Sequence, residues 1–481
     1  MPPIDSIQPP AREGIADTHP TLQRRLGLFS LTLYGLGNML GAGIYGTIGA
    51  AAQGLGNALW MAFAASMVAA GLTGLSYACL GSRYPRAAGA AYITQRAYRA
   101  PFLTYLVGLA VLFSGLTSMA TASHVFSNYF LSVLDPRISA MGSEWTTRSV
   151  ALPFLLALAF VNFWGIRESA WLNALCTVIE TAGLLFIIAF GLRFVGGVDY
   201  LDASSPNNPS GDLSLMLVLG GAVLTFFSFI GFEDLLNVSE EVKKPERTLP
   251  LALVGALLLA TCIYMTVSVV AVSVVPSAEL AASDKPALYL VVDKAAPWVK
   301  PQVFAFVAMF AVMNTALLNF IMGSRLVYGM AKQGLLPAFL GKVHPNRRTP
   351  HVAILILLAI VLVLVAVGSI ASLAQATSLL LLGSFTVVNV ALVILKRRPG
   401  EARGGFEVPA AIPALGAGIC LAMIGNGAWK MIAGYQRARE QGQTEAIEKL
   451  LPLLIALALV GGISLLYGIL RPRPAEEASL E

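Results

Sequence analysis

The chain has 481 residues, of which 57% are hydrophobic and 12% are charged, and its mean hydropathy is +0.74. Soluble domains typically carry about 25% charged residues, so this composition excludes a soluble protein and indicates a membrane protein with many spans. The Lys and Arg behind the net charge of +6 lie in short loops between apolar runs, which excludes a basic stripe for nucleic acid.

Apolar runs of about 20 residues, the length that crosses a bilayer as a helix, recur along the chain. We predict twelve transmembrane helices, at 28–52, 57–80, 101–132, 150–165, 169–194, 213–238, 248–275, 300–330, 351–370, 372–395, 409–432 and 450–470. These runs divide the chain into a cytoplasmic tail (1–27), two five-helix repeats (28–195 and 196–399), two extra helices (400–471) and a second tail (472–481).

The Lys and Arg residues predict the orientation. With the N-terminus in the cytoplasm, about 22 of the 32 Lys and Arg fall on the inner side, as the positive-inside rule requires. Both termini are therefore expected to be cytoplasmic. The short loops favour the inner membrane of a bacterium, where the chain would be a monomer or a homodimer.

Several classes of site are not indicated. The four cysteines lie inside apolar runs without CxxC spacing, so neither a disulfide framework nor a zinc site is expected. The chain holds no GxSxG, HExxH or GxxxxGK[ST] motif, and we therefore expect no enzyme, no ATP-driven pump, no metal and no cofactor.

Four glycines interrupt the first apolar run between Leu36 and Gly46. Each costs a helix about 1 kcal/mol relative to Ala, and lipid tolerates broken backbone only where it lines a protected cavity. The stretch therefore predicts a binding site at membrane depth. Alternatively the glycines serve close helix packing, since Gly37 and Gly41 have the spacing of a small-xxx-small contact.

A second interruption lies in the sixth run, where Gly231 is followed by the adjacent carboxylates Glu233 and Asp234. Because a repeat of five spans is odd, the second copy would enter from the opposite face of the membrane. The two broken helices would then run antiparallel through the midplane, as in secondary transporters built from inverted repeats. Half-helix N-termini would be available for an anionic group, and freed carbonyls for a cation.

Four motifs stand in order between about residues 24 and 435: GxxxGAGIY (37–45), YPRAAGAAY (84–92), FIGFED (229–234) with EEVKKPERTLP (240–250), and SRLVYGMAKQGLLP (324–337). Together they resemble signatures of the amino acid-polyamine-organocation superfamily of transporters. The resemblance implies an all-α membrane protein of twelve transmembrane helices, with a 5+5 inverted repeat and discontinuous helices 1 and 6. It also implies an amino acid or amine substrate carried by alternating access.

The resemblance assigns candidate substrate-binding residues. The substrate carboxylate would rest on amides of the first break, at Gly41, Ala42, Gly43 and Ile44. The substrate amino group would meet carbonyls of the second break, at Phe229, Ile230 and Gly231, and Phe229 is our candidate for an aromatic gate. A zwitterion between opposite half-helix ends would have both charges met without a charged side chain.

Polar residues on two other spans extend this list. Met119 and Ser123 on the third span are candidate pocket residues, and His124 beside them is either a hydrogen-bonded packing residue or a proton carrier. Asn314 on the eighth span, with Thr315, offers the oxygen ligands that a hard cation such as sodium requires.

Three carboxylates are candidates for proton coupling or gating. Glu180 lies mid-span in the fifth run, where facing lipid would cost about 2.5 kcal/mol or more, so we expect it to face the bundle. Several proton-coupled members of the family that the chain resembles carry a Lys on this face of the fifth helix. This chain has Glu180 there instead, which either carries a proton or is a neutral structural carboxyl. Adjacent residues point about 100° apart on a helix, so we predict that Glu233 and Asp234 cannot both face one ligand. Glu233 would serve an inner gate or a proton relay, unless inner-side Lys or Arg hold both acids.

We therefore expect a secondary active transporter, with proton-coupled uptake of a small neutral amino acid. An amino acid/amine antiporter, a sodium-coupled symporter and, from a different class, a ligand-sensing membrane scaffold stay open.

Overall fold

The computed structural model describes residues 26–85, 89–134, 144–164, 169–283, 285–332, 334–347, 349–401, 403–442 and 446–472. Most of this part of the chain is helical, and two isolated β-bridges, Leu26 with Val242 and Ser205 with Asn208, are its extended pairings. The tails predicted at 1–27 and 472–481 lie almost wholly outside the described residues.

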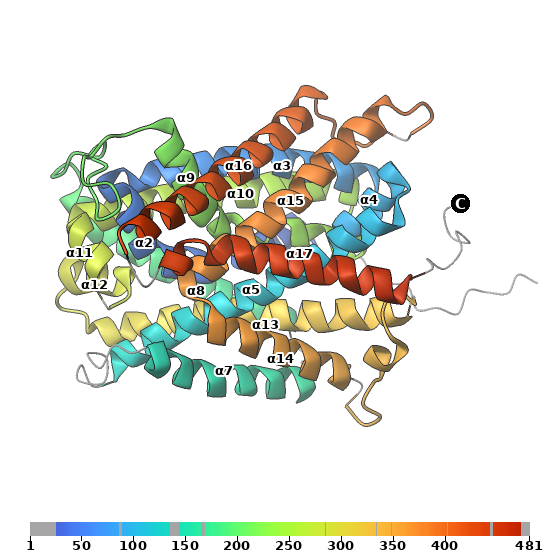
Figure 1. Cartoon of the computed structure of the whole chain (residues 1–481), viewed down its shortest axis with the longest axis horizontal. Helices are drawn as coiled ribbons and strands as arrows, with labels where there is room; N and C mark the ends of the chain where they lie inside the picture. Colours follow the sequence, from blue (N-terminus) through green and yellow to red (C-terminus); the bar gives the residue numbers. More distant parts are fainter. Residues whose placement is uncertain are drawn as a thin grey trace, which may run out of the picture.

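Long helices occupy the predicted apolar runs (Figure 1). Their bounds are α1 Leu28–Met39, α2 Ala42–Leu55, α3 Leu59–Arg83, α5 Pro101–Val133, α7 Glu144–Trp164, α8 Ser169–Gly191, α9 Leu215–Thr225, α10 Pro245–Val274, α13 Pro301–Lys332, α14 His351–Val367, α15 Ile370–Arg397, α16 Ala411–Glu440 and α17 Leu451–Leu470. Three short helices lie in connections: α4 Gly89–Tyr98, α11 Ser277–Ala282 and α12 Ala287–Ala295.

The helices confirm a multi-span membrane protein. Among the described residues, 10 helical stretches are long and apolar enough to cross a membrane, and the first of them, Leu28–Arg83, contains α1, α2 and α3. Helix α14 is a shorter apolar helix of 17 residues. The all-α membrane fold is thus confirmed, while the count of twelve crossings stays a prediction.

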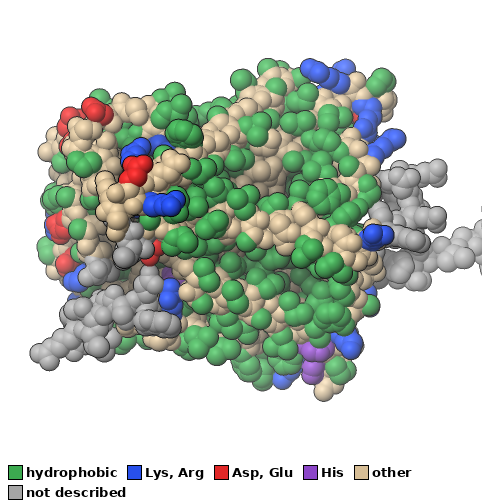
Figure 2. Space-filling view, viewed as in Figure 1, with side chains coloured by type: hydrophobic (Ala, Val, Ile, Leu, Met, Phe, Trp, Pro, Cys, Tyr) green, Lys and Arg blue, Asp and Glu red, His purple; other side chains and the backbone are tan. Residues whose placement is uncertain are grey.

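Charged side chains gather at the two ends of the molecule. Figure 2 shows Asp and Glu mainly at its left end and chiefly Lys and Arg at its right end, with a mostly apolar flank between them. The right end, where α4 and the last turn of α17 lie in Figure 1, is the end that the charge bias predicts to be cytoplasmic. We call it the inner end and the opposite one the outer end; the orientation itself stays a prediction.

Both predicted helix breaks are present. Helix α1 ends at Met39, Leu40 is extended, Gly41 has φ +118°, and α2 then begins. Helix α9 passes into a 3₁₀ turn at Phe226–Phe229, after which Ile230 is extended, Gly231 has φ +118°, and a second 3₁₀ turn runs from Phe232 to Leu236. A side chain rarely adopts this φ, so both reversals depend on glycine.

Candidate functional site

The two breaks touch each other through their glycines. A Cβ atom added at Gly43 would lie 2.4 Å from the Cα of Ser228, and one added at Gly231 would lie 2.6 Å from the carbonyl oxygen of Asn38. Real Cβ atoms do not approach backbone this closely, so only glycine lets the two backbones meet. The close-packing role and the helix-breaking role therefore coincide at Gly231, whereas Gly43 lies in the first turn of α2 and serves close packing.

Tyrosine hydroxyls hold the freed carbonyls. The hydroxyl of Tyr264, on α10, lies 2.7 Å from the carbonyl oxygen of Met39 and 2.8 Å from that of Ser228. A hydroxyl has one proton, so at any moment it can donate a full hydrogen bond to only one of these two carbonyls. Within α2, the carbonyl of Tyr45 accepts a further hydrogen bond of 3.1 Å from the hydroxyl of Tyr129 on α5. Helix α10 thus joins the first break to the second.

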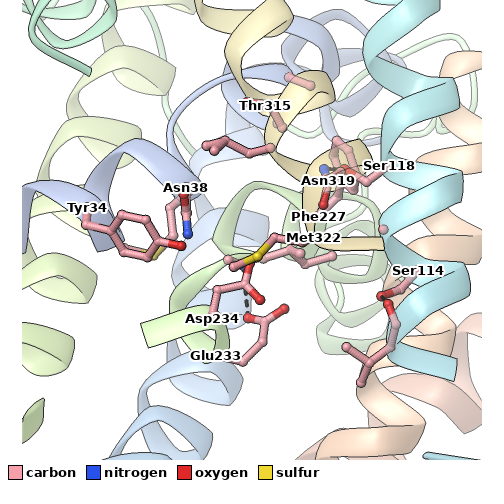
Figure 3. Close-up of a pocket in the computed structure, with 18 residues that line it drawn as sticks. Tyr34, Asn38, Ser114, Ser118, Phe227, Glu233, Asp234, Thr315, Asn319 and Met322 are labelled. Atoms are coloured by element: carbon pink, nitrogen blue, oxygen red, sulfur yellow. Dashed lines mark hydrogen bonds between the residues drawn. The ribbon is translucent and has the colours of Figure 1, made fainter. Parts of the chain in front are cut away.

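A cavity of about 60 Å³ lies beside the breaks (Figure 3). This volume holds roughly two water molecules, so the space is small. Polar side chains from α1, α5, α13 and the second break line it: Tyr34, Asn38, Ser114, Ser118, Glu233, Asp234, Thr315 and Asn319. The Oδ1 atom of Asn38 is buried and accepts no hydrogen bond from the described residues.

Both carboxylates after Gly231 line this cavity, and our prediction that they cannot face one ligand is wrong. Glu233 turns back to accept a 2.9 Å hydrogen bond from the amide of Gly231, while Asp234 accepts one of 3.1 Å from the Asn237 amide. The 3₁₀ turn here still sets adjacent side chains about 120° apart, so both carboxylates reach one cavity because the Glu233 side chain folds back onto Gly231. No Lys, Arg or His occurs among the described residues that line the cavity, so its ionisable lining consists of the two acidic side chains.

The predicted substrate residues are only partly brought together. Ala42, Gly43, Ile230 and Gly231 line the cavity. Gly41 and Ile44 are buried beside it, and Phe229 packs edge-on against Tyr264 with ring centroids 5.2 Å apart.

On the neighbouring helices, Ser123 bonds the carbonyl of Met119 at 2.8 Å within α5, and both are fully buried. Asn314 is buried in α13 next to Thr315, which does line the cavity. The roles of all these residues stay predictions.

Glu180 faces the bundle interior, as expected: it is 0% exposed. Neither of its carboxylate oxygens makes a hydrogen bond of ordinary geometry among the described residues, although the Thr177 hydroxyl lies near. The backbone carbonyl of Glu180 accepts a 2.8 Å hydrogen bond from Tyr45. The carboxyl therefore sits beside the half-helix that follows the first break.

His124 lies away from this cavity, where its Nε2 is 3.2 Å from the carbonyl oxygen of Val365 in α14. A carbonyl can only accept, so Nε2 carries the proton in this contact. Of the two alternatives for His124, this geometry favours a hydrogen-bonded packing residue over a proton carrier.

Sequence reasoning missed several residues of the site. Asn38 lies inside the glycine-rich stretch, and a polar residue at that position could have been predicted to line the site. Tyr264 had no local signal, because a tyrosine in a long apolar helix is usually a packing residue and only the packing of α10 brings it to the breaks. Asn319 is polar like Asn314 and Thr315 on the same helix, and that polarity was a usable signal.

Comparison with known proteins agrees with this architecture. The sequence model of the amino acid permease family matches residues 26–438. The chain is 28% identical over 438 residues to the branched-chain amino acid permease BcaP of Bacillus subtilis, an alignment that covers 86% of this chain and 90% of that protein.

Two further relatives show the breadth of the similarity. A methylthioribose transporter of Bacillus subtilis is 30% identical over 419 residues, covering 83% of this chain and 88% of that protein. The vacuolar cationic amino acid transporter 4 of Arabidopsis thaliana is 31% identical over 393 residues, covering 79% of this chain and 64% of that protein. The chain belongs to the amino acid permease family.

Proposed function

We propose that the chain is a secondary active transporter that works by alternating access and takes up a small neutral amino acid together with a proton. One observation carries this proposal: backbone released at two separate breaks converges on one small cavity. Irregular backbone at membrane depth is typical of a site that opens to each face in turn.

The cavity supports a small zwitterion as substrate. Amides at the start of α2, including Ala42 and Gly43, would receive the carboxylate, because a helix N-terminus favours negative charge. The amino group would lie between the carbonyls of the second break and the unpartnered Oδ1 of Asn38. A volume of about 60 Å³ favours glycine or alanine over larger side chains unless the helices move.

Glu180 is our candidate for the proton-coupling group. Its carboxylate oxygens accept no hydrogen bond of ordinary geometry from the described residues, and a proton gained or lost there would change the charge beside α2. Glu233 and Asp234 would then act at the inner gate or as a proton relay. Their place in the lining of the same cavity supports this division, since a proton could pass between them beside the bound substrate.

Uptake of a cationic amino acid is the second candidate. It is favoured by the two carboxylates in a cavity whose described lining has no basic side chain. One relative is named as a cationic amino acid transporter, so the family accommodates such substrates. Exchange of an amino acid for an amine and sodium coupling through Asn314 and Thr315 are further alternatives.

Counterflow in proteoliposomes tests the proposal. Vesicles loaded with unlabelled glycine, alanine, leucine, lysine or putrescine would be offered the labelled compounds, first without gradients and then with proton or sodium gradients. We expect glycine or alanine to exchange, and a proton gradient to drive accumulation. Exchange of lysine alone would favour the second candidate, and binding without any flux would favour a ligand-sensing scaffold.

A further inference from the structure

The connection between α13 and α14 gathers basic side chains at the inner end. Residues 332–350 contain four Lys and Arg and no Asp or Glu, and the neighbouring connection from α7 to α8 adds Arg167 and Glu168. Counted over the whole sequence, the two connections therefore carry five Lys or Arg and one acid. Figure 2 shows histidine and basic side chains together at the lower right, where α7 ends and α14 begins in Figure 1. The charge of this corner is positive even with its acid included.

Hydrogen bonds fold this connection onto the end of α7. The Thr349 hydroxyl donates to the carbonyl of Phe163 at 2.9 Å, and the amide of His344 donates to the carbonyl of Thr349 at 2.9 Å. The His344 ring packs edge-on against Phe163 with ring centroids 5.2 Å apart, and its Nδ1 accepts a 3.2 Å hydrogen bond from the amide of Arg347. The backbone of Arg347 is thus held beside the last turn of α7.

The guanidinium of Arg347 lies over the ring of Trp164, the last residue of α7. Its Cζ is 3.9 Å from the ring centroid, and Trp164 is 53% exposed. An aromatic face attracts a guanidinium through its charge and uses none of its five N–H donors in conventional hydrogen bonds. Within the described part of the chain, this guanidinium forms no ion pair. Its donors are therefore available to an anion.

Positive-inside topology explains basic residues at this end, but it does not explain this placement. The rule depends on how many Lys and Arg a loop contains, and not on where each side chain lies. Tryptophan is enriched where a membrane meets water, at the level of the lipid headgroups. A guanidinium held over an exposed Trp164 is therefore expected at headgroup depth.

An apolar surface continues from Trp164 toward the middle of the molecule. Phe160, one turn earlier on α7, lies with its ring centroid 5.3 Å from that of Trp164, and both side chains are exposed. Leu156 on α7 and Leu355 on α14 are exposed as well. Helices α7 and α14 pack side by side along one flank of the molecule (Figure 1). This flank offers a surface for acyl chains directly below the cation.

We propose that Arg347 and Trp164 bind the headgroup of an anionic phospholipid, with the phosphate on the guanidinium and the acyl chains along Phe160. A guanidinium matches a phosphate with two parallel N–H···O hydrogen bonds. Lys342, exposed in the same connection, adds to the positive field. A zwitterionic lipid carries its own ammonium beside the phosphate, so the positive corner favours the anionic class. The site does not depend on the proposed transport.

Lipid titration followed by native mass spectrometry tests this site. The purified full chain in detergent would be titrated with phosphatidylglycerol or with phosphatidylcholine of identical acyl chains, and the dissociation constant of the first bound lipid measured. We expect phosphatidylglycerol to bind about fivefold more tightly, which is the contribution of one cation near a membrane surface. Inorganic phosphate in excess should leave the bound phosphatidylglycerol in place, because it lacks the acyl chains.

Variants locate the bound lipid. Arg347→Gln should weaken phosphatidylglycerol binding about fivefold and leave phosphatidylcholine binding unchanged. Trp164→Leu removes the ring beneath the guanidinium and should weaken the same binding, whereas Arg347→Lys keeps the charge without the planar fork and should retain part of the preference. The matched control is Arg397→Gln, which removes an exposed arginine at the inner end of α15 and should change neither constant.

Equal affinity of the wild type for the two lipids would overturn the anionic-lipid assignment. Equal effects of Arg347→Gln and Arg397→Gln would reduce the preference to total charge and overturn the site. Displacement of phosphatidylglycerol by inorganic phosphate would assign the guanidinium to a soluble anion instead of a lipid.

Discussion

The hydroxyl of Tyr45 donates a 2.8 Å hydrogen bond to the main-chain carbonyl of Glu180. Tyr45 belongs to α2, the half-helix that starts at the first break, and Glu180 belongs to α8. The bond ties the helix that carries the buried carboxyl to the helix that helps form the substrate site. A change of charge at Glu180 would therefore act directly beside α2.

Glu180→Gln should separate exchange from proton-driven accumulation. The amide has nearly the same shape but cannot release a proton, so counterflow exchange should persist while uptake driven by a proton gradient should fall about tenfold or more. Initial rates in proteoliposomes between pH 5.5 and 8 would measure both.

The matched control is Glu279→Gln, which changes an exposed carboxylate of the outer end. It should leave exchange and accumulation as in the wild type. Full accumulation by the Glu180 variant with an unchanged pH profile would end the coupling proposal and leave Glu180 as a structural carboxyl.

Gly43→Ala should impair transport, because the new Cβ would lie 2.4 Å from the Cα of Ser228 and 2.9 Å from its Cβ. Backbone on either side must shift, and overpacking of this kind costs about 1–3 kcal/mol, which predicts a loss of about tenfold or more in counterflow rate.

Gly54→Ala is its control in the same helix, where an added Cβ meets nothing within 4 Å. It should transport normally and favour the helix slightly. Normal transport by the Gly43 variant would contradict the close contact of the two breaks.

Tyr264→Phe should weaken both breaks at once. The variant keeps the ring that packs on Phe229 but removes the only proton shared by the carbonyls of Met39 and Ser228. Leaving buried acceptors unsatisfied costs about 1–3 kcal/mol, so thermal unfolding should move to lower temperature and the half-saturating substrate concentration should rise.

Tyr435→Phe, a change on the extra helix α16 away from the breaks, should alter neither quantity. An unchanged unfolding temperature and unchanged affinity in the Tyr264 variant would show that the hydroxyl contributes nothing to the site.

The parts of this architecture that depend on the bilayer could be predicted from the sequence. Hydrocarbon thickness sets helix length, and the cost of unpaired backbone in lipid makes the glycines around Gly41 informative. The directions of Glu233 and Asp234 were mispredicted because the Glu233 side chain folds back onto the amide of Gly231, which residue spacing along a helix does not reveal. Tyr264 could not be predicted, because its role depends on where α10 packs.

Two carboxylates fasten the loop between α15 and α16 at the inner end. Glu407 accepts two hydrogen bonds of 2.6 Å from Arg83 at the end of α3 and also pairs with Lys396 of α15. Glu401 accepts from the Tyr84 hydroxyl at 2.6 Å and from Arg96 of α4 at 2.9 Å. The loop thus joins α15 to the inner end of α3 and to α4.

Glu407→Gln should lower stability in a pH-dependent way. Partial burial alone would raise the pKa of Glu407, but hydrogen bonds from Arg83 and Lys396 outweigh it and lower the pKa from 4.5 to about 2. A depressed pKa contributes stability that is complete above the ordinary pKa and is lost as the pH falls through the lowered pKa.

Between pH 5 and 8 the Glu407→Gln variant should therefore be less stable than the wild type by a constant amount, about 2 kcal/mol for a charged, bidentate contact. The offset should shrink as the pH falls from about 4.5 to about 2, because the unfolded chain takes up this proton first and the folded carboxyl gains it only near the lower value. Glu279→Gln breaks a pair with Lys294 that is 41–42% exposed, and should shift unfolding far less at every pH. Thermal unfolding of the purified proteins across this pH range measures both offsets, and equal offsets for the two variants would contradict a fastening role for Glu407.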